Sequence, residues 1–210
     1  MLQIVVLLGI LVFLGVFRGL ITQLIARLFG HAIGEHALKQ QPDTIHLERV
    51  DQPHWTNASA ISSIADPLLS RGFQDAGTFS VAEMPGVQVR LLAHPGDFFY
   101  SAIYQHPQAG VWFEFVARYD KDRTATFTTS RPTGLSPRPG HMTVNAPGVS
   151  ATALLDRART ERPRGTFLPV SVPSAVGDFE AGYADSIAWR KNKGVSTREV
   201  VEVAKRSKAA

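Results

Sequence analysis

The residues with the most chemical potential in this sequence gather between positions 93 and 115. This stretch holds two His-Pro pairs, at His94 and His106, together with the carboxylates of Asp97 and Glu114 and several aromatic rings. Imidazoles and carboxylates are side chains that bind metal ions and transfer protons. The stretch therefore raises the question of whether these groups form one metal or acid–base site.

The spacing of the two histidines argues against a shared site. Residues 97–105 alternate between apolar and polar types, which predicts a strand. At about 3.3 Å per residue, such a strand separates His94 from His106 by about 30 Å. Each histidine also precedes a proline, which ends a strand. We expect two strand-end residues and no metal site. Acid–base chemistry and cross-strand ion pairs use the same types of side chain and look alike in sequence. Both are open for Glu114, Arg90, His94 and Asp97.

The composition excludes several other kinds of site. The 210 residues include no cysteine, so the chain has no disulfide, thiolate zinc site, iron–sulfur cluster or cysteine nucleophile. The motifs of P-loops, dinucleotide-binding folds, kinases, HExxH metalloproteases and G-x-S-x-G hydrolases are missing from the sequence. We therefore expect no cofactor, we assign no catalytic residue, and we favour a non-enzymatic protein.

The N-terminal segment predicts a membrane anchor. Residues 1–17 carry no charged side chain and would span about 25 Å as a helix, and residues 18–29 continue with helical spacing of apolar side chains. We predict a retained anchor over 1–29; a cleaved signal peptide and a buried core helix are the alternatives. Arg18, Arg27 and Lys39 follow the apolar run, which predicts that the globular domain lies on the cytoplasmic side. Residues 30–56 are expected to form a polar tether, in which Thr44–Val50 is a candidate edge strand.

Residues 57–165 predict an α+β globular domain. Helical spacing over residues 57–72, with Pro67 as an interruption, gives way to a period of two. The turn-forming stretches between the alternating runs are too short for crossover helices, so the strands should pair antiparallel in sequential order. The five predicted strands are Thr78–Glu83, Val87–His94, Asp97–Gln105, Val111–Tyr119 and Arg123–Ser130.

If the lengths of the loops are assumed, the strand pattern also predicts which residues pair across neighbouring strands. A two-residue loop at 95–96, a four-residue loop at 106–109 and a three-residue loop at 120–122 would pair Glu114 with Thr128 and Arg118 with Thr124. One sheet face is then the core, and the other carries large apolar side chains that solvent alone would not favour. This second face is covered by the C-terminal segment, docks a protein partner or holds a ligand. The candidate interaction residues on it are Leu92, Phe99, Ile103, Trp112, Val116, Arg90 and Glu114.

Residues 166–210 predict a helical, basic C-terminal extension. The proline- and glycine-rich stretch 130–148 is expected to be a loop, and a short helix is expected from the Ser150 cap to Pro163. A longer helix is expected over 175–192, and Ser196 and Glu199 form a capping box for another. We do not expect nucleic acid as a partner; anionic lipid or a protein suits the basic residues better. The candidate contact residues are Arg190, Lys191, Lys193, Arg198, Lys205, Arg206 and Lys208.

Together these patterns predict a single-pass membrane helix, a five-stranded antiparallel β-meander packed by helices, and the helical extension. The function that suits this organisation is a membrane-tethered, non-enzymatic interaction or accessory subunit, with membrane lipid and a protein partner, or a second copy of the chain, as its contacts. The alternative is a membrane-bound hydrolase or small-ligand sensor that uses the second face of the sheet.

Overall fold

The computed structural model describes residues 35, 36 and 38–208. The described residues divide into two compact units, one made of residues 42–132 and 137–189 and the other of the described residues before 42 together with 133–136 and 190–208. The predicted anchor over residues 1–29 lies outside the described residues. Among the helices that the structure describes, none is both long enough and apolar enough to cross a membrane. The single-pass, membrane-spanning part of the predicted fold is therefore not supported.

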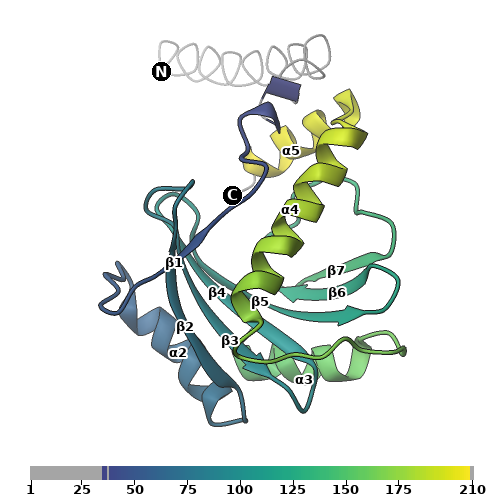
Figure 1. Cartoon of the computed structure of the whole chain (residues 1–210). Coiled ribbons are helices and arrows are strands. Elements are labelled where there is room, and N and C mark those ends of the chain that lie inside the picture. The colour runs from purple at the N-terminus through teal and green to yellow at the C-terminus, as the bar shows by residue number, and fades with distance from the viewer. Residues whose placement is uncertain (1–34, 37, 209–210) are drawn as a thin grey trace, which may run out of the picture. The chain divides into compact units, whose positions relative to one another are not determined.

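Seven strands of the described chain form one mixed sheet (Figure 1). They lie side by side in sequence order; neighbours from β1 to β6 are antiparallel, whereas β7 runs parallel to β6. The predicted five-stranded antiparallel meander is therefore wrong in the number of strands and in the direction of the last one. The strands are β1 (Leu47–Arg49), β2 (Gln74–Val81), β3 (Gln88–His94), β4 (Phe99–His106), β5 (Gly110–Tyr119), β6 (Arg123–Thr128) and β7 (His141–Asn145).

The two added strands have different origins. β1 lies within Thr44–Val50, so the possibility of an edge strand in the tether is confirmed. β7 lies within the proline- and glycine-rich stretch that we expected to be a loop. A parallel neighbour needs a connection long enough to return to the start of the previous strand. Residues 129–140 supply that connection without a helix, which is why the sequence pattern did not reveal it.

The register differs from the prediction in an instructive way. The three-residue loop at 120–122 is confirmed, and Glu114 pairs with Thr128 as expected. The loop after β3 has four residues, 95–98, because the positive φ (57°) falls on Phe98 and not on Gly96. The loop after β4 has three residues, since His106 pairs with Gly110. That difference of one residue turns β5 over relative to β4, because alternate side chains point to opposite faces.

Four helices of the described chain accompany the sheet. Asn57 and Ser150 cap the first two through their side chains, as expected for Ser150. Pro67 does not interrupt the first helix as predicted; it lies inside the last turn, close to the end. The helices are α2 (Ala58–Leu69), α3 (Ala151–Glu161), α4 (Ala175–Lys193) and α5 (Thr197–Lys208).

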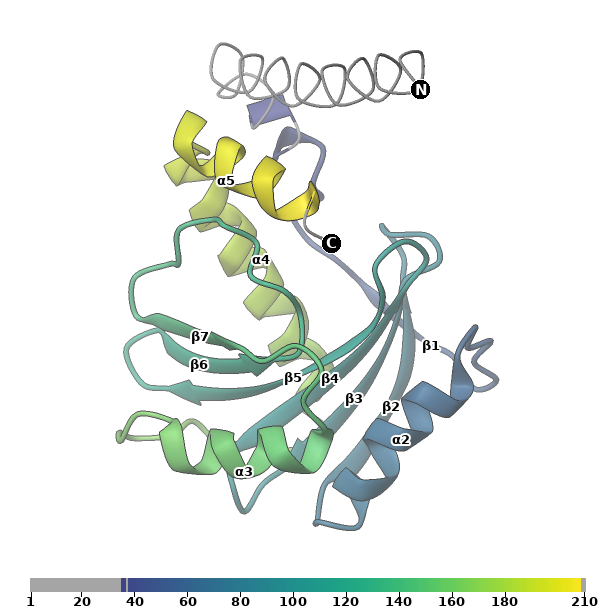
Figure 2. The ribbon, with the colours of Figure 1, turned by 180° about the vertical axis from the view of Figure 1, so that it is seen from behind.

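The sheet has two contrasting faces. α2 and α3 cover one face, and the part of α4 up to residue 189 crosses the opposite one (Figures 1 and 2). The side chains of the α2/α3 face include Leu92, Phe99, Ile103, Phe113, Phe115 and Phe127, all buried. The side chains of the α4 face include Val89, Leu91, Tyr100, Tyr104, Trp112, Glu114 and Arg118.

Candidate functional site

A row of mostly polar side chains crosses the α4 face over four strands. Ala102, Glu114, Thr128 and Asn145 are successive cross-strand partners on β4, β5, β6 and β7. Tyr104 and Trp112 form the adjacent pair on β4 and β5. Cross-strand partners point to the same face, so an aromatic pair and a carboxyl lie side by side. This local cluster is the strongest candidate for a functional site in the described chain.

Tyr104 connects the aromatic and the acidic part of the cluster. Its ring stacks on Trp112, with 4.7 Å between ring centroids and 12° between ring planes. Phe179 of α4 packs against the same tyrosine at 6.1 Å. The Tyr104 hydroxyl donates a hydrogen bond of 2.7 Å to Glu114 Oε1. Since the tyrosine ring contacts aromatic residues from two elements, it holds the carboxyl in a defined orientation.

The pKa values of Glu114 and Tyr104 both differ from their ordinary values. Burial raises the pKa of Glu114 above its ordinary value, and the hydrogen bond from Tyr104 opposes only part of that increase. Burial, together with the nearby Glu114, raises the pKa of Tyr104 well above its usual range. Within the described chain, no basic side chain pairs with Glu114. A partly buried carboxyl without a counter-charge is costly for stability and is typical of functional sites.

A second carboxyl on this face is fully paired. Asp178, in the first turn of α4, forms an ion pair of 2.6 Å with Arg118 Nη1 and accepts a hydrogen bond of 2.6 Å from the Tyr100 hydroxyl. The Arg118 guanidinium also lies over the Tyr100 ring, 5.4 Å from its centroid. This cluster fixes the start of α4 to β4 and β5. Its role is therefore explained by structure alone.

The structure divides the seven predicted interaction residues between different surroundings. Leu92, Phe99 and Ile103 have no exposed surface and belong to the core under α2 and α3. Arg90 pairs with Asp75 at 2.6 Å. The remaining three residues lie on the α4 face and are partly exposed, so the predicted set does not form one surface. These three are Trp112, Glu114 and Val116.

The histidines of the opening stretch are turn residues. His94 Nδ1 accepts a hydrogen bond from the backbone N–H of Asp97, and its Nε2 contacts the Arg71 carbonyl at 3.1 Å. Asp97 pairs with Arg159 of α3. His106 Nδ1 accepts two backbone N–H groups of the turn that follows it. Among the described residues, no group of histidines and carboxylates is arranged to hold a metal ion.

One further cluster resembles a catalytic relay but is incomplete. His141 Nδ1 lies 2.9 Å from Thr124 Oγ1, and His141 Nε2 lies 3.6 Å from Asp122. The second distance is too long for a hydrogen bond, and Arg138 already pairs with the same carboxylate. Burial, and then the charge of Arg138, lower the pKa of His141. The imidazole is therefore not poised as a base by Asp122.

The predicted basic residues lie in the unit that contains residues 190–208, and several of them form ion pairs or hydrogen bonds. Arg190 and Lys193 both contact Glu199 Oε1, at 3.2 and 2.8 Å, and Lys191 donates to the Gln41 carbonyl. Burial alone would raise the pKa of Glu199, but the bonds from Lys193, Ser196 and Ser136 together lower it far below its usual value. The predicted capping box is confirmed, because Ser196 and Glu199 bond reciprocally.

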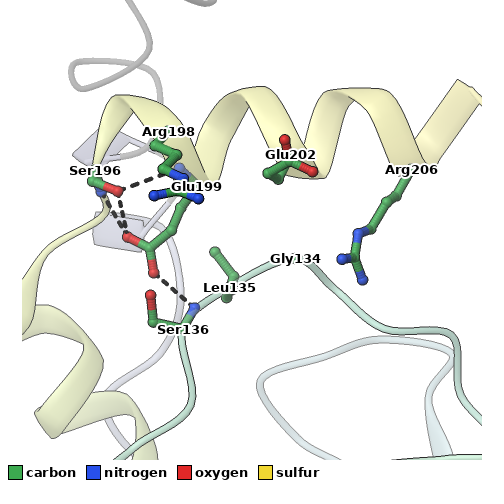
Figure 3. A pocket seen from close by; sticks show the side chains of 8 residues that line it. All are labelled: Gly134, Leu135, Ser136, Ser196, Arg198, Glu199, Glu202 and Arg206. Carbon is green, nitrogen blue, oxygen red and sulfur yellow. Dashed lines mark hydrogen bonds between the residues drawn. The ribbon is translucent and has the colours of Figure 1, made fainter.

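Arg198 and Arg206 line an open pocket of about 380 Å³ beside α5 (Figure 3). Residues Gly134–Ser136 form its opposite wall. Arg198 lies beside Ser196 and Glu199, whereas Arg206 extends at the far end. The side chains of Lys205 and Lys208 lie outside those that the structure describes. The predicted contact of this basic segment with lipid or a partner stays a prediction, as does the cytoplasmic location.

Comparison with known proteins adds no relative: no family model, no curated protein and no solved structure matches this chain. The site therefore has to be judged on its own geometry. The sequence analysis identified Trp112 and Glu114 but missed Tyr104 and Phe179, which hold them. Cross-strand pairing of Tyr104 with Trp112 would have followed from a three-residue loop after β4. The contact with Phe179 depends on how α4 crosses the sheet.

Proposed function

We propose that this chain is a non-enzymatic interaction module that binds another molecule on the α4 face, around Trp112 and Glu114. The observation that carries the proposal is the partly buried Glu114 carboxyl, which is oriented by Tyr104 and has no basic partner among the described residues. Folding stability alone does not favour such a group. Its position beside a partly exposed tryptophan suits recognition, because aromatic residues with a few oriented polar groups are typical of binding sites.

The experiment compares what the full-length chain captures with and without Trp112. We expect a binding partner that is retained by the unaltered chain and lost by Trp112→Ala. Leu168→Ala is the matched control, since it removes another exposed large apolar side chain. Thr126→Arg, which adds bulk to the α4 face next to Val116, should have the same effect as Trp112→Ala. Circular dichroism and thermal unfolding establish that each variant is folded. Partners that survive both α4-face substitutions would overturn the proposal.

A second candidate function is acid–base catalysis by Glu114. The raised pKa of its carboxyl favours this alternative, because a carboxyl that keeps its proton to a higher pH than usual is better suited to act as a general acid. Glu114→Gln distinguishes the two functions once a bound molecule is known. A catalyst would lose turnover and keep affinity, whereas an interaction module would lose affinity and show no turnover in either form.

A further inference from the structure

Two carboxyls on the α4 face, those of Asp178 and Glu114, differ in their partners. Asp178 is neutralised by Arg118 at 2.6 Å. Glu114 receives only the neutral hydroxyl of Tyr104, and the described residues provide no hydrogen bond to its second oxygen, Oε2. The face therefore presents one carboxyl oxygen that is oriented and without a partner. A positively charged group is the ligand chemistry that complements it best.

The aromatic residues beside this carboxyl favour the same kind of ligand. Trp112 and Glu114 are two residues apart on β5, so their side chains leave the same face about 7 Å apart. Trp112 stays partly exposed although Tyr104 covers one of its ring faces. The face of an indole ring attracts cations more strongly than the other aromatic side chains do. A carboxyl and an indole at this separation form two sides of a cation site.

Other ligand classes fit less well. An anion would approach both the carboxyl and the electron-rich ring face, which repel it. A purely apolar group would cover Glu114 without supplying a hydrogen bond or a charge, and a carboxyl left in that state is costly. The rigid contacts of Tyr104 with Trp112 and Phe179 also preorganise the site, which reduces the entropy lost on binding.

We infer that Trp112 and Glu114 form a site for an organic ammonium ion, held by the indole face and the carboxylate together. This inference rests on the proposed function, because it names the chemistry that the α4 face recognises. The ammonium group belongs to a free ligand or to a lysine side chain of a partner. Binding requires the ionised carboxyl, so affinity should increase as the pH rises through the raised pKa of Glu114.

The test titrates the full-length chain with tetramethylammonium chloride at pH 8 and follows the Trp112 indole N–H by NMR. The resonance is assigned by its absence from Trp112→Phe, since the chain has three tryptophans. Sodium chloride at equal ionic strength and tert-butanol, a neutral molecule of similar shape, are the ligand controls. We expect a saturable shift with tetramethylammonium only. N-acetyl-lysine methylamide forms a second arm: tighter binding than tetramethylammonium assigns the site to a lysine side chain.

Three variants sharpen the test. Glu114→Gln should weaken tetramethylammonium binding about tenfold or more, because it removes the carboxylate that the described residues place beside the Trp112 indole. Trp112→Leu keeps an apolar side chain and should weaken binding roughly twofold to fivefold. Because this variant lacks the indole, its titration is followed at the backbone N–H of Glu114. Glu48→Gln removes an equal charge from an exposed position on β1 and should leave affinity unchanged.

Three results would overturn the inference: no saturable shift with tetramethylammonium, an equal shift with tert-butanol, or unchanged affinity in Glu114→Gln. None depends on the outcome for the proposed function. If tetramethylammonium fails to bind while Trp112→Ala still loses its captured partner, the interaction module stands and only its cation specificity is wrong. If the captured partners survive every α4-face substitution, the proposed function itself fails.

Discussion

The two faces of the sheet differ in the burial and polarity of their side chains. On the α2/α3 face, the largest side chains are fully buried and apolar, including Phe99, Phe115 and Phe127. On the α4 face, the same strands carry Tyr104 and Glu114, which are partly exposed and joined by a hydrogen bond. Because strands alternate, each contributes to both faces at once. Both faces hold buried apolar side chains, among them Val89 and Leu91 on the α4 face, but the α4 face adds the costly polar pair of Tyr104 and Glu114.

The sharpest test of this difference is a large-to-small substitution on the α2/α3 face. Phe99 contacts Phe115 at 6.2 Å between ring centroids, and the Arg162 guanidinium lies over its ring. Phe99→Ala should lower the free energy of unfolding by about 3–5 kcal/mol, because it leaves a cavity in a packed core. Chemical denaturation measures this loss.

Trp112→Ala is the matching substitution on the α4 face. It removes a larger ring, but one that is partly exposed, so we expect less than half of the destabilisation seen for Phe99→Ala. Equal losses for the two variants would break the distinction between the faces. The result also decides which residue is suited to binding experiments, since only Trp112 can be replaced with the fold intact.

The positions of β2 to β6 were predictable from the sequence, but β7, its parallel direction and the assignment of side chains to faces were not. Five alternating runs correctly located β2 to β6, because each has a clear period of two. An error of two residues in the loop after β3 left the faces unchanged. An error of one residue after β4 exchanged them for all of β5, which moved Trp112 and Val116 away from Phe99. Loop length, which sequence patterns determine poorly, therefore controlled the outcome.

The candidate site was predictable only in part, for a similar reason. Glu114 stood out as a carboxyl in an aromatic strand, and its pairing with Thr128 followed from the loop at 120–122. Its hydrogen bond to Tyr104 needs the correct β4–β5 register. The contact between Tyr104 and Phe179 spans a distance in sequence that no local pattern encodes. Long-range placement of α4 is a property of packing, not of periodicity.

A third prediction concerns the attachment of α4 to its face. Asp178→Ala removes the partner of Arg118 and of the Tyr100 hydroxyl and leaves a partly buried cation unpaired. We expect a loss of about 2–3 kcal/mol, the usual size for hydrogen bonds to charged groups. Hydrogen exchange should show reduced protection at the start of α4 and little change in α3. Asp185→Ala, at an exposed position on the same helix, is the control. Unchanged protection in α4 would mean that its apolar contacts alone hold it.

A smaller effect is expected from Tyr104→Phe, which keeps the ring and removes the hydroxyl. The variant should lose about 1 kcal/mol, the net value of one hydrogen bond. It should also raise the pKa of Glu114 further, because the bond from Tyr104 favours the ionised carboxyl. NMR titration of the Glu114 side-chain carbonyl carbon measures that change. A lower pKa in the variant would show that Tyr104 does not orient the carboxyl.

The smallest expected effect is a pH dependence of stability that belongs to the α4 face alone. Burial raises the pKa of Glu114 in the folded chain, so between its ordinary pKa and this raised value the folded state holds a proton that the unfolded state releases. Stability contributed by the protonated carboxyl is therefore lost as the pH rises through the raised pKa. Glu114→Gln cannot ionise, so it should gain stability relative to the unaltered chain as the pH rises from the ordinary pKa of a glutamate to the raised value.

Urea denaturation across that pH range measures the difference, with Glu48→Gln as an exposed carboxyl that should show no such trend. The opposite trend, with the unaltered chain gaining on Glu114→Gln as the pH rises, would mean that the folded chain stabilises the carboxylate. In that case Glu114 would already have a positively charged partner within the chain, and the α4 face would offer no site for an ammonium ion.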